Sequence, residues 1–396
     1  MLQANLTTFV VLLMVASAVA ILVKAVPVPY EVALAVVGLV AGSLAAPIPF
    51  QLTPTVILAA FLPGLLFEAA YRLDWRLLRR NLVAVIALAT AGVLLTSLLV
   101  GGLVHLLLGL SLPIAFLIGT MLAPTDPVAV LAVFRRLGLP ERLTNLVEAE
   151  SLANDGTGLV LFSMALAFMT AAGSGLDLAE SFLRLVLGGL GLGALIGFAA
   201  SLLISRVDDF TVEMTVTAIA AYGGYLLADS LRFSGILAVV AAAVIMGNYG
   251  RRHGMSDETR QAVDLSWEYV AFLLNSLLFL LIGLAVALPQ LLAAAGLVLA
   301  VAAIALFARA AAVYAVLNLL RPLGQSAPLR WQHLLVWGGM RGAIAVALVL
   351  SLQGRGGAYD LVETLVYGAA LLSLLVQGLT IGPLARRLLS RPEALA

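Results

Sequence analysis

The chain has 396 residues, of which 63% are hydrophobic and 11% are charged, and its formal net charge is +1. A mean hydropathy of +1.11 exceeds what the core of a soluble protein absorbs, and repeated apolar runs of 18 or more residues predict transmembrane helices. The absence of cysteine excludes disulfides, thiol nucleophiles and thiolate metal sites, and the small net charge gives no reason to expect a nucleic-acid partner.

In chain order, the apolar runs and the residues that break them predict an all-α polytopic membrane protein of about thirteen transmembrane helices. The first run has no basic segment before it and is too long for the core of a signal peptide, so we expect a retained first helix. We expect residues 1–396 to form a single membrane domain with no soluble domain. The predicted spans are 6–25, 31–47, 54–71, 82–109, 112–134, 146–172, 180–205, 209–230, 234–249, 262–288, 291–319, 331–353 and 360–385.

The basic residues orient these spans. With the N-terminus outside, 17 of the 22 basic residues fall in loops on the cytoplasmic side, where the positive-inside rule expects them. The exceptions are Arg184, Arg232 and Arg355 outside, and Arg309 and Arg341 within spans. This distribution predicts an odd number of helices with the C-terminus in the cytoplasm, and the short, tail-less chain predicts the plasma membrane of a prokaryote.

Two predicted helices are interrupted. Span 112–134 contains the residues APTDP at 123–127, and span 331–353 contains GGMRG at 338–342. If span 180–205 is a linker, six helices lie on each side of it, the interruptions fall at equivalent positions and the two halves are inverted repeats. Matched broken helices of this kind indicate the binding site of a transporter.

A second polar cluster, ESLAND at 150–155, lies inside span 146–172. On a helix Ser151 and Asp155 share one face, and Glu150 and Asn154 share the next. A carboxylate, a hydroxyl and freed carbonyls suit a hard cation such as Na⁺. Because a lone charge at membrane depth is costly, Asp155 is predicted to bind either a proton or a cation, which is sufficient for exchange. The alternative is that Asp155 only bonds a neighbouring helix.

Proline on both sides of Thr125 and Asp126 removes a donor and disfavours helix. Thr125 therefore has a carbonyl free for a cation, and Asp126 can neutralise the positive ends of the half-helices. The alternative is a kink with a capping aspartate, and both interpretations can hold together.

Three more polar residues lie within predicted spans, and each needs a partner or an aqueous environment. Glu150 requires a cationic partner, and Arg309 and Arg341 are both candidates. Glu68 either snorkels to the interface or lines an access funnel for cations. Asn275 is expected to form an interhelical hydrogen bond.

Five motifs resemble the monovalent cation/proton antiporter family of the NhaP and eukaryotic Na⁺/H⁺ exchanger type. They are LPGLLFE at 62–68, APTDPVA at 123–129, ESLANDGT at 150–157, ARA and VY at 308–310 and 313–314, and GGMRGA at 338–343. The motifs occur in the order and at the spacing of that family, and the resemblance covers essentially the whole membrane domain.

The resemblance implies a homodimer of thirteen-helix protomers in which two broken helices cross near the midplane. Each protomer would have a dimerisation scaffold, here 1–75 and 180–288, and a mobile core, here 80–172 and 291–388, which carries the ion across the membrane.

The same resemblance implies roles for single residues. Na⁺ would bind at Asp155, Ser151 and the Thr125 carbonyl, with Glu68 as a peripheral or water-mediated ligand. Asn154 and Asp126 would hold the crossing, Glu150 would pair with Arg309, and Arg341 would stabilise the core. Asn rather than a second Asp before Asp155 implies electroneutral exchange of one cation for one proton. No cofactor is expected beyond the transported Na⁺ or Li⁺ and H⁺.

Two other function classes compete. A K⁺ uniporter or channel would use the same residues without proton coupling. An intramembrane aspartyl protease would pair two aspartates, but its Gly-x-Gly-Asp signature is absent, so we expect no enzyme.

Overall fold

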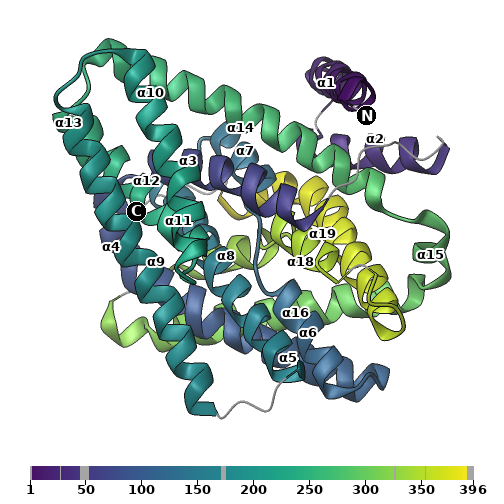
Figure 1. Cartoon of the computed structure of the whole chain (residues 1–396). Helices are drawn as coiled ribbons and strands as arrows, with labels where there is room; N and C mark the ends of the chain where they lie inside the picture. Colours follow the sequence, from purple (N-terminus) through teal and green to yellow (C-terminus); the bar gives the residue numbers. More distant parts are fainter. Residues whose placement is uncertain are drawn as a thin grey trace.

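The computed structural model describes residues 2–26, 28–44, 53–170, 175–324, 327–352 and 354–389, which form helices joined by short connections, with no strand in those ranges (Figure 1). The helices are α1 Leu2–Val23, α2 Tyr30–Leu44, α3 Leu62–Arg72, α4 Trp75–Ala87, α5 Val93–Leu108, α6 Leu112–Leu122, α7 Val128–Leu137, α8 Glu141–Thr170, α9 Gly175–Ile204, α10 Phe210–Ala218, α11 Gly224–Ser230, α12 Gly235–Ile245, α13 Arg251–His253, α14 Asp257–Ala285, α15 Leu288–Ala293, α16 Ala295–Leu319, α17 Leu329–Trp337, α18 Ala343–Leu350 and α19 Ala358–Leu389. Short π-helical stretches are η1 Val56–Phe61, η2 Leu88–Gly92, η3 Ile219–Gly223 and η4 Met246–Gly250, and η5 Arg321–Leu323 is a 3₁₀ turn.

Each predicted span overlaps one helix or a run of consecutive helices. The largest difference is at the span predicted to begin at residue 82, because the helix there begins at Trp75. The Asp74 side chain accepts a hydrogen bond from the Arg76 backbone N–H at 2.6 Å and so caps the first turn. Arg76, Arg79 and Arg80 therefore lie in a helix, not in the predicted loop, because helical hydrogen bonding continues beyond the apolar stretch.

The protein is an all-helical, multi-span membrane protein. Among the described residues, six helices or continuous helical runs are long and apolar enough to cross a membrane. Large apolar side chains cover the outer surface of two of them: Leu195 and Leu203 on α9 are 67% and 51% exposed, and Phe307 on α16 is 60% exposed. Such surfaces suit lipid, because every helical backbone group is already bonded within its own segment.

Both predicted interruptions are present. One helix stops at Leu122 and resumes as α7 at Val128, and the other stops at Trp337 and resumes as α18 at Ala343. The two extended segments contact each other, since the Asp126 backbone N–H donates to the Met340 carbonyl at 2.7 Å. Four half-helices therefore end around one point.

Glycines let helices of the surrounding framework approach closely. A Cβ atom on Gly38 of α2 would lie 3.1 Å from the Gly283 Cα of α14, and one on Gly193 of α9 would collide with the Ala238 carbonyl of α12. Gly193 of α9 thus lies on a packing surface between the two helices. Figure 1 shows α14 as a long helix with α1 and α2 beside its C-terminal half. This contact positions one wall of the candidate site.

Candidate ion-binding site

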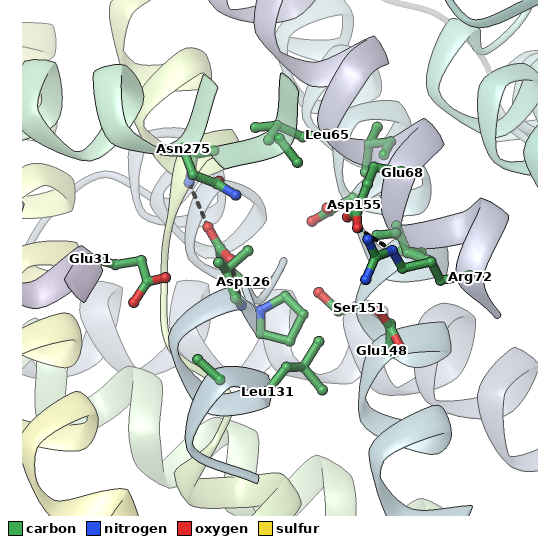
Figure 2. Close-up of a pocket in the computed structure, with 18 of the residues that line it drawn as sticks. Glu31, Leu65, Glu68, Arg72, Asp126, Leu131, Glu148, Ser151, Asp155 and Asn275 are labelled. Atoms are coloured by element: carbon green, nitrogen blue, oxygen red, sulfur yellow. Dashed lines mark hydrogen bonds and ion pairs between the residues drawn. The ribbon is translucent and has the colours of Figure 1, made fainter. Parts of the chain in front are cut away.

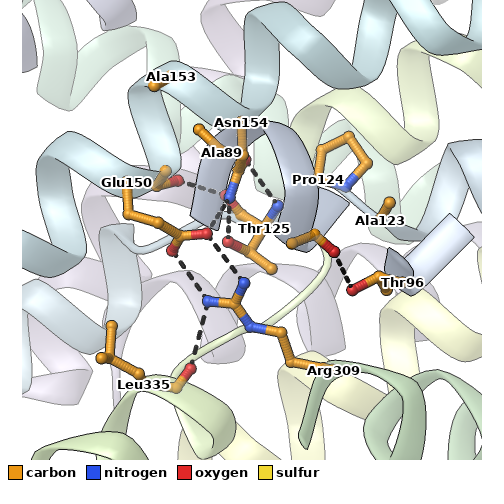
Figure 3. Close-up of polar contacts among 12 residues, drawn as sticks. Ala89, Thr96, Ala123, Pro124, Thr125, Glu150, Ala153, Asn154, Arg309 and Leu335 are labelled. Carbon is orange, nitrogen blue, oxygen red and sulfur yellow. Dashed lines mark hydrogen bonds and ion pairs between the residues drawn. The ribbon is translucent and has the colours of Figure 1, made fainter. Parts of the chain in front are cut away.

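The extended segment between α6 and α7 is held against α8 by Asn154, whose side chain is fully buried (Figure 3). Its Nδ2 donates to Thr125 Oγ1 at 2.8 Å and to Glu150 Oε1 at 2.9 Å. Its Oδ1 accepts from the Thr125 backbone N–H at 3.1 Å. The polar groups that the proline-flanked break frees are therefore bonded within the protein, as membrane depth requires.

Ser151 and Asp155 lie on the α8 face that borders the break. Ser151 Oγ donates to the Thr125 carbonyl. The Asp155 carboxylate has no ion pair within the described ranges. It borders a cavity of about 260 Å³ and a pocket of about 20 Å³ beside the two breaks, the latter large enough for one water molecule (Figure 2). The structure thus brings together the three predicted oxygen ligands.

Asp126 caps two half-helices at once. Its Oδ1 accepts from the Val128 N–H at 3.1 Å, and its Oδ2 accepts from the Ala343 N–H at 3.3 Å. The positive ends of the α7 and α18 dipoles therefore meet one carboxylate. Gly342 lies against this carboxylate, and a Cβ atom there would collide with Asp126.

Arg341 has the opposite charge to Asp126 and lies at the opposite kind of helix end. Its Nη1 donates to the Ala123 carbonyl at 2.9 Å and to the Pro124 carbonyl at 3.2 Å, at the C-terminal end of α6. Its backbone N–H donates to Ser373 Oγ at 2.9 Å. A cation at the negative end of one half-helix and an anion at two positive ends compensate the charges that the breaks expose.

Glu150 pairs with Arg309, so the choice left open by the sequence falls on the arginine of α16 (Figure 3). The pair is bidentate, with Nη1–Oε1 and Nη2–Oε2 distances of 2.9 Å each. The two residues are only 1% and 3% exposed. Arg309 Nη2 also donates to the Leu335 carbonyl at 3.4 Å and so ties α8 and α16 to α17.

The larger cavity lies between α3 and α14 on one side and α7 and α8 on the other, and charged pairs line it. Glu68 Oε1 is 2.6 Å from Arg72 Nε, Arg72 Nη2 is 3.0 Å from Glu268 Oε2, and Arg135 Nη2 is 3.2 Å from Glu148 Oε1. Glu68 therefore lines the cavity, a position that favours the access-path interpretation over snorkelling.

Two further polar residues line this cavity, and no pattern in the sequence predicts their position there. Glu31 of α2 is 7% exposed. It is the first residue of a predicted span, where an acidic side chain is ordinary, so nothing in the sequence singles it out. Asn275 of α14 was expected to form an interhelical hydrogen bond, but its buried Oδ1 has no partner. That expectation is wrong for this oxygen, because the cavity lies where a partner helix would be.

The donor set decides which ions the site suits. The described residues hold no group of three or more His, Cys, Asp or Glu side chains arranged for a metal ion. Asp155, Ser151 and the Thr125 carbonyl offer oxygen atoms and one negative charge. Such a set matches a hard monovalent cation better than a divalent or transition metal, which prefers more charge or nitrogen and sulfur ligands.

The model of the transmembrane sodium/hydrogen exchanger family matches residues 10–387. The chain belongs to the sodium/hydrogen exchanger family. It is therefore a member of a family of ion transporters, not of enzymes, and the resemblance of its five motifs is confirmed.

Named relatives agree with this assignment. The chain is 39% identical to the Na⁺/H⁺ antiporter ApNhaP of Aphanothece halophytica, over 98% of this chain and 75% of the relative. It is 38% identical to the Na⁺/H⁺ antiporter NhaP of Pseudomonas aeruginosa, over 84% and 81%. The solved structure of the sodium proton antiporter MjNhaP1 from Methanocaldococcus jannaschii is 22% identical, with a TM-score of 0.81 over 98% of this chain and 100% of that one. The fold is like that of MjNhaP1.

Proposed function

We propose that this exchanger exchanges Na⁺ or Li⁺ for H⁺ across a membrane by secondary active antiport. The relatives named above are Na⁺/H⁺ antiporters, and the family match spans nearly the whole chain. The observation that carries the proposal is the position of Asp155. Its carboxylate has no cationic partner in the described residues and borders two cavities beside Ser151 and the Thr125 carbonyl.

Competition for one carboxylate supplies the coupling. An unpaired carboxylate at membrane depth is costly, so either a proton or a cation must accompany Asp155 as it leaves the aqueous side. Asn154 cannot add a second exchangeable charge, and its amide is already bonded to Thr125 and Glu150. We therefore propose electroneutral exchange of one cation for one proton, with Glu68 as a peripheral or water-mediated ligand.

Transport by alternating access requires one part of the protein to move past another. We propose that the scaffold comprises 1–75 and 180–288 and that the core comprises 80–172 and 291–388. The cavity supports this division, since its walls come from α2, α3 and α14 on one side and from α7, α8 and α18 on the other. We further propose thirteen spans in two inverted repeats, with the N-terminus outside and the C-terminus in the cytoplasm, and a homodimer in a prokaryotic plasma membrane.

The test is reconstitution into liposomes that contain a pH dye, with the membrane potential clamped. Addition of Na⁺, Li⁺ or K⁺ outside should drive proton efflux in the wild type and rank the three cations. Asp155→Asn should abolish this flux. Asp229→Asn, the same change at an exposed residue, should leave it intact.

A different result identifies the alternative. Cation flux without proton movement at any pH from mildly acidic to alkaline would reject exchange and support a uniporter or channel. Equal proton flux in the wild type and in Asp155→Asn would reject Asp155 as the shared site.

A further inference from the structure

Glu31 is a buried carboxylate that the proposed mechanism does not use. It is 7% exposed, and its Oε2 has no hydrogen-bond partner. Figure 2 shows its side chain reaching from α2 toward Asp126 across the cavity, on the far side from Asp155 and Glu68. A buried oxygen without a donor is costly unless a ligand completes its coordination.

The position of Glu31 is held by its neighbour. The Tyr30 ring stacks on Phe272 of α14 with centroids 5.6 Å apart, and its hydroxyl lies 2.8 Å from Ser276 Oγ. Close packing of Gly38 against α14 extends the same contact for two further turns. Glu31 therefore belongs to a rigid wall, and its carboxylate is held facing the cavity.

Asn275 contributes a second free oxygen from the same wall. It lies on α14 between Phe272 and Ser276, the residues that anchor Tyr30, and it lines the cavity. Its buried Oδ1 has no donor. Two acceptor oxygens from neighbouring helices, neither with a partner, thus border one space.

The charges around this space are unbalanced. Asp126 lies opposite, and the two N-termini that it caps hold its carboxylate in place, so it remains a fixed acceptor. The two arginines that line the cavity, Arg72 and Arg135, already pair with Glu68 and Glu148. Within the described ranges no basic side chain forms an ion pair with Glu31.

We propose that Glu31, Asn275 and Asp126 form a second binding station for a monovalent cation, separate from Asp155. The ligands are a carboxylate and an amide oxygen from the wall of α2 and α14, with the Asp126 carboxylate opposite. The N-termini of α7 and α18 compensate the Asp126 carboxylate, which leaves Glu31 as the one uncompensated charge of the station and favours a singly charged ion. The inference deepens the proposed antiport by adding a station on the path to Asp155.

The station has a functional consequence for transport. A cation that enters the cavity meets oxygen ligands on the α2–α14 wall before or after it occupies Asp155. Because Glu31 and Asn275 lie on one wall and Asp126 and Asp155 on the other, movement of the walls pulls the ligands of the Glu31 station apart and leaves the cation to Asp155. Loss of the Glu31 station should weaken the apparent affinity for the cation and leave the maximal transport rate at saturating cation largely unchanged.

The experiment measures equilibrium binding of radioactive Na⁺ to the purified protein. Four proteins are compared: the wild type, Asp155→Asn, Glu31→Gln and the double variant Asp155→Asn/Glu31→Gln. Asp155→Asn should retain weaker binding that the double variant lacks. Glu31→Gln alone should raise the KM for Na⁺ in liposomes about tenfold, the scale expected from losing one charge-assisted contact.

Two further variants test whether a loss of Na⁺ binding comes from misfolding and not from loss of the station. The double variant Asp155→Asn/Asn275→Leu keeps the side-chain volume at residue 275, removes the oxygen and should lack residual binding as Asp155→Asn/Glu31→Gln does. Glu213→Gln makes the same chemical change at a fully buried glutamate of α10 that does not line the cavity, and should alter neither binding nor KM.

The outcomes separate this inference from the proposed antiport. The second station is overturned if Asp155→Asn binds no Na⁺, or if its residual binding persists unchanged in both double variants. If residual binding depends on Glu31 but the wild type moves no protons, the station stands and the antiport proposal fails.

Discussion

The bidentate pair of Glu150 and Arg309 should be the most sensitive electrostatic contact for stability. Arg309→Met leaves a buried carboxylate without a counter-charge, and Glu150→Gln leaves a buried guanidinium. Two charge-assisted hydrogen bonds of 2.9 Å are lost or weakened in each case, at about 1.5–3 kcal/mol apiece. Breaking one side of a buried ion pair costs about 3–5 kcal/mol, which agrees with that sum.

Removing both charges should cost less than the two single changes together. In Glu150→Gln/Arg309→Met no uncompensated charge remains, so the double variant should be more stable than the sum of the single losses predicts, by about 2–3 kcal/mol. Thermal unfolding in detergent, followed by tryptophan fluorescence, measures all three, with single losses on the order of 5 °C or more.

An exposed pair provides the control. Glu268→Gln breaks the contact with Arg72 at 3.0 Å, but the Glu268 side chain is 64% exposed. Its loss should cost no more than about 1 kcal/mol. Strictly additive losses at Glu150 and Arg309, or single losses no larger than that of Glu268→Gln, would refute the reasoning.

Three other changes test the site and the helix ends. Gly342→Ala should lower the free energy of unfolding by about 1–3 kcal/mol, and with it the melting temperature, because its Cβ displaces the Asp126 carboxylate. The same displacement should lower the transport rate. Gly102→Ala, with open space around it, should change neither quantity. Ser151→Ala should leave the fold intact and raise the KM for Na⁺ about threefold to tenfold in the liposome assay; an unchanged KM would remove this hydroxyl from the ligand set. The Thr211 hydroxyl, and then the Val212 and Thr211 backbone N–H groups, donate hydrogen bonds that lower the pKa of the exposed Asp209 carboxyl. Its contribution to stability is therefore present at neutral pH and lost as the pH falls below about 4. The melting difference between wild type and Asp209→Ala should therefore shrink on acidification, and a difference that grows would contradict this account.

Local patterns account for what the sequence could predict. Hydropathy locates helices, and proline or glycine runs locate breaks, because both depend on residues close together in the chain. Asp155 and Ser151 stood out for the same reason, as polar groups one turn apart in an apolar helix. Helix ends were less predictable, as at Asp74, because a capped polar turn extends the helix beyond the apolar run.

The sequence by itself determined the class of protein, the two broken helices and the face of α8 that carries the candidate ligands. Tertiary structure decided which partners these groups meet. Glu150 finds Arg309 across 159 residues, and Asp126 caps a helix that begins 217 residues later. Glu31 became informative only when α2 was packed on α14 at the edge of the cavity. The physical reason is that periodicity and helix breakers act along the chain, whereas charge pairing and free volume depend on which distant helices come together.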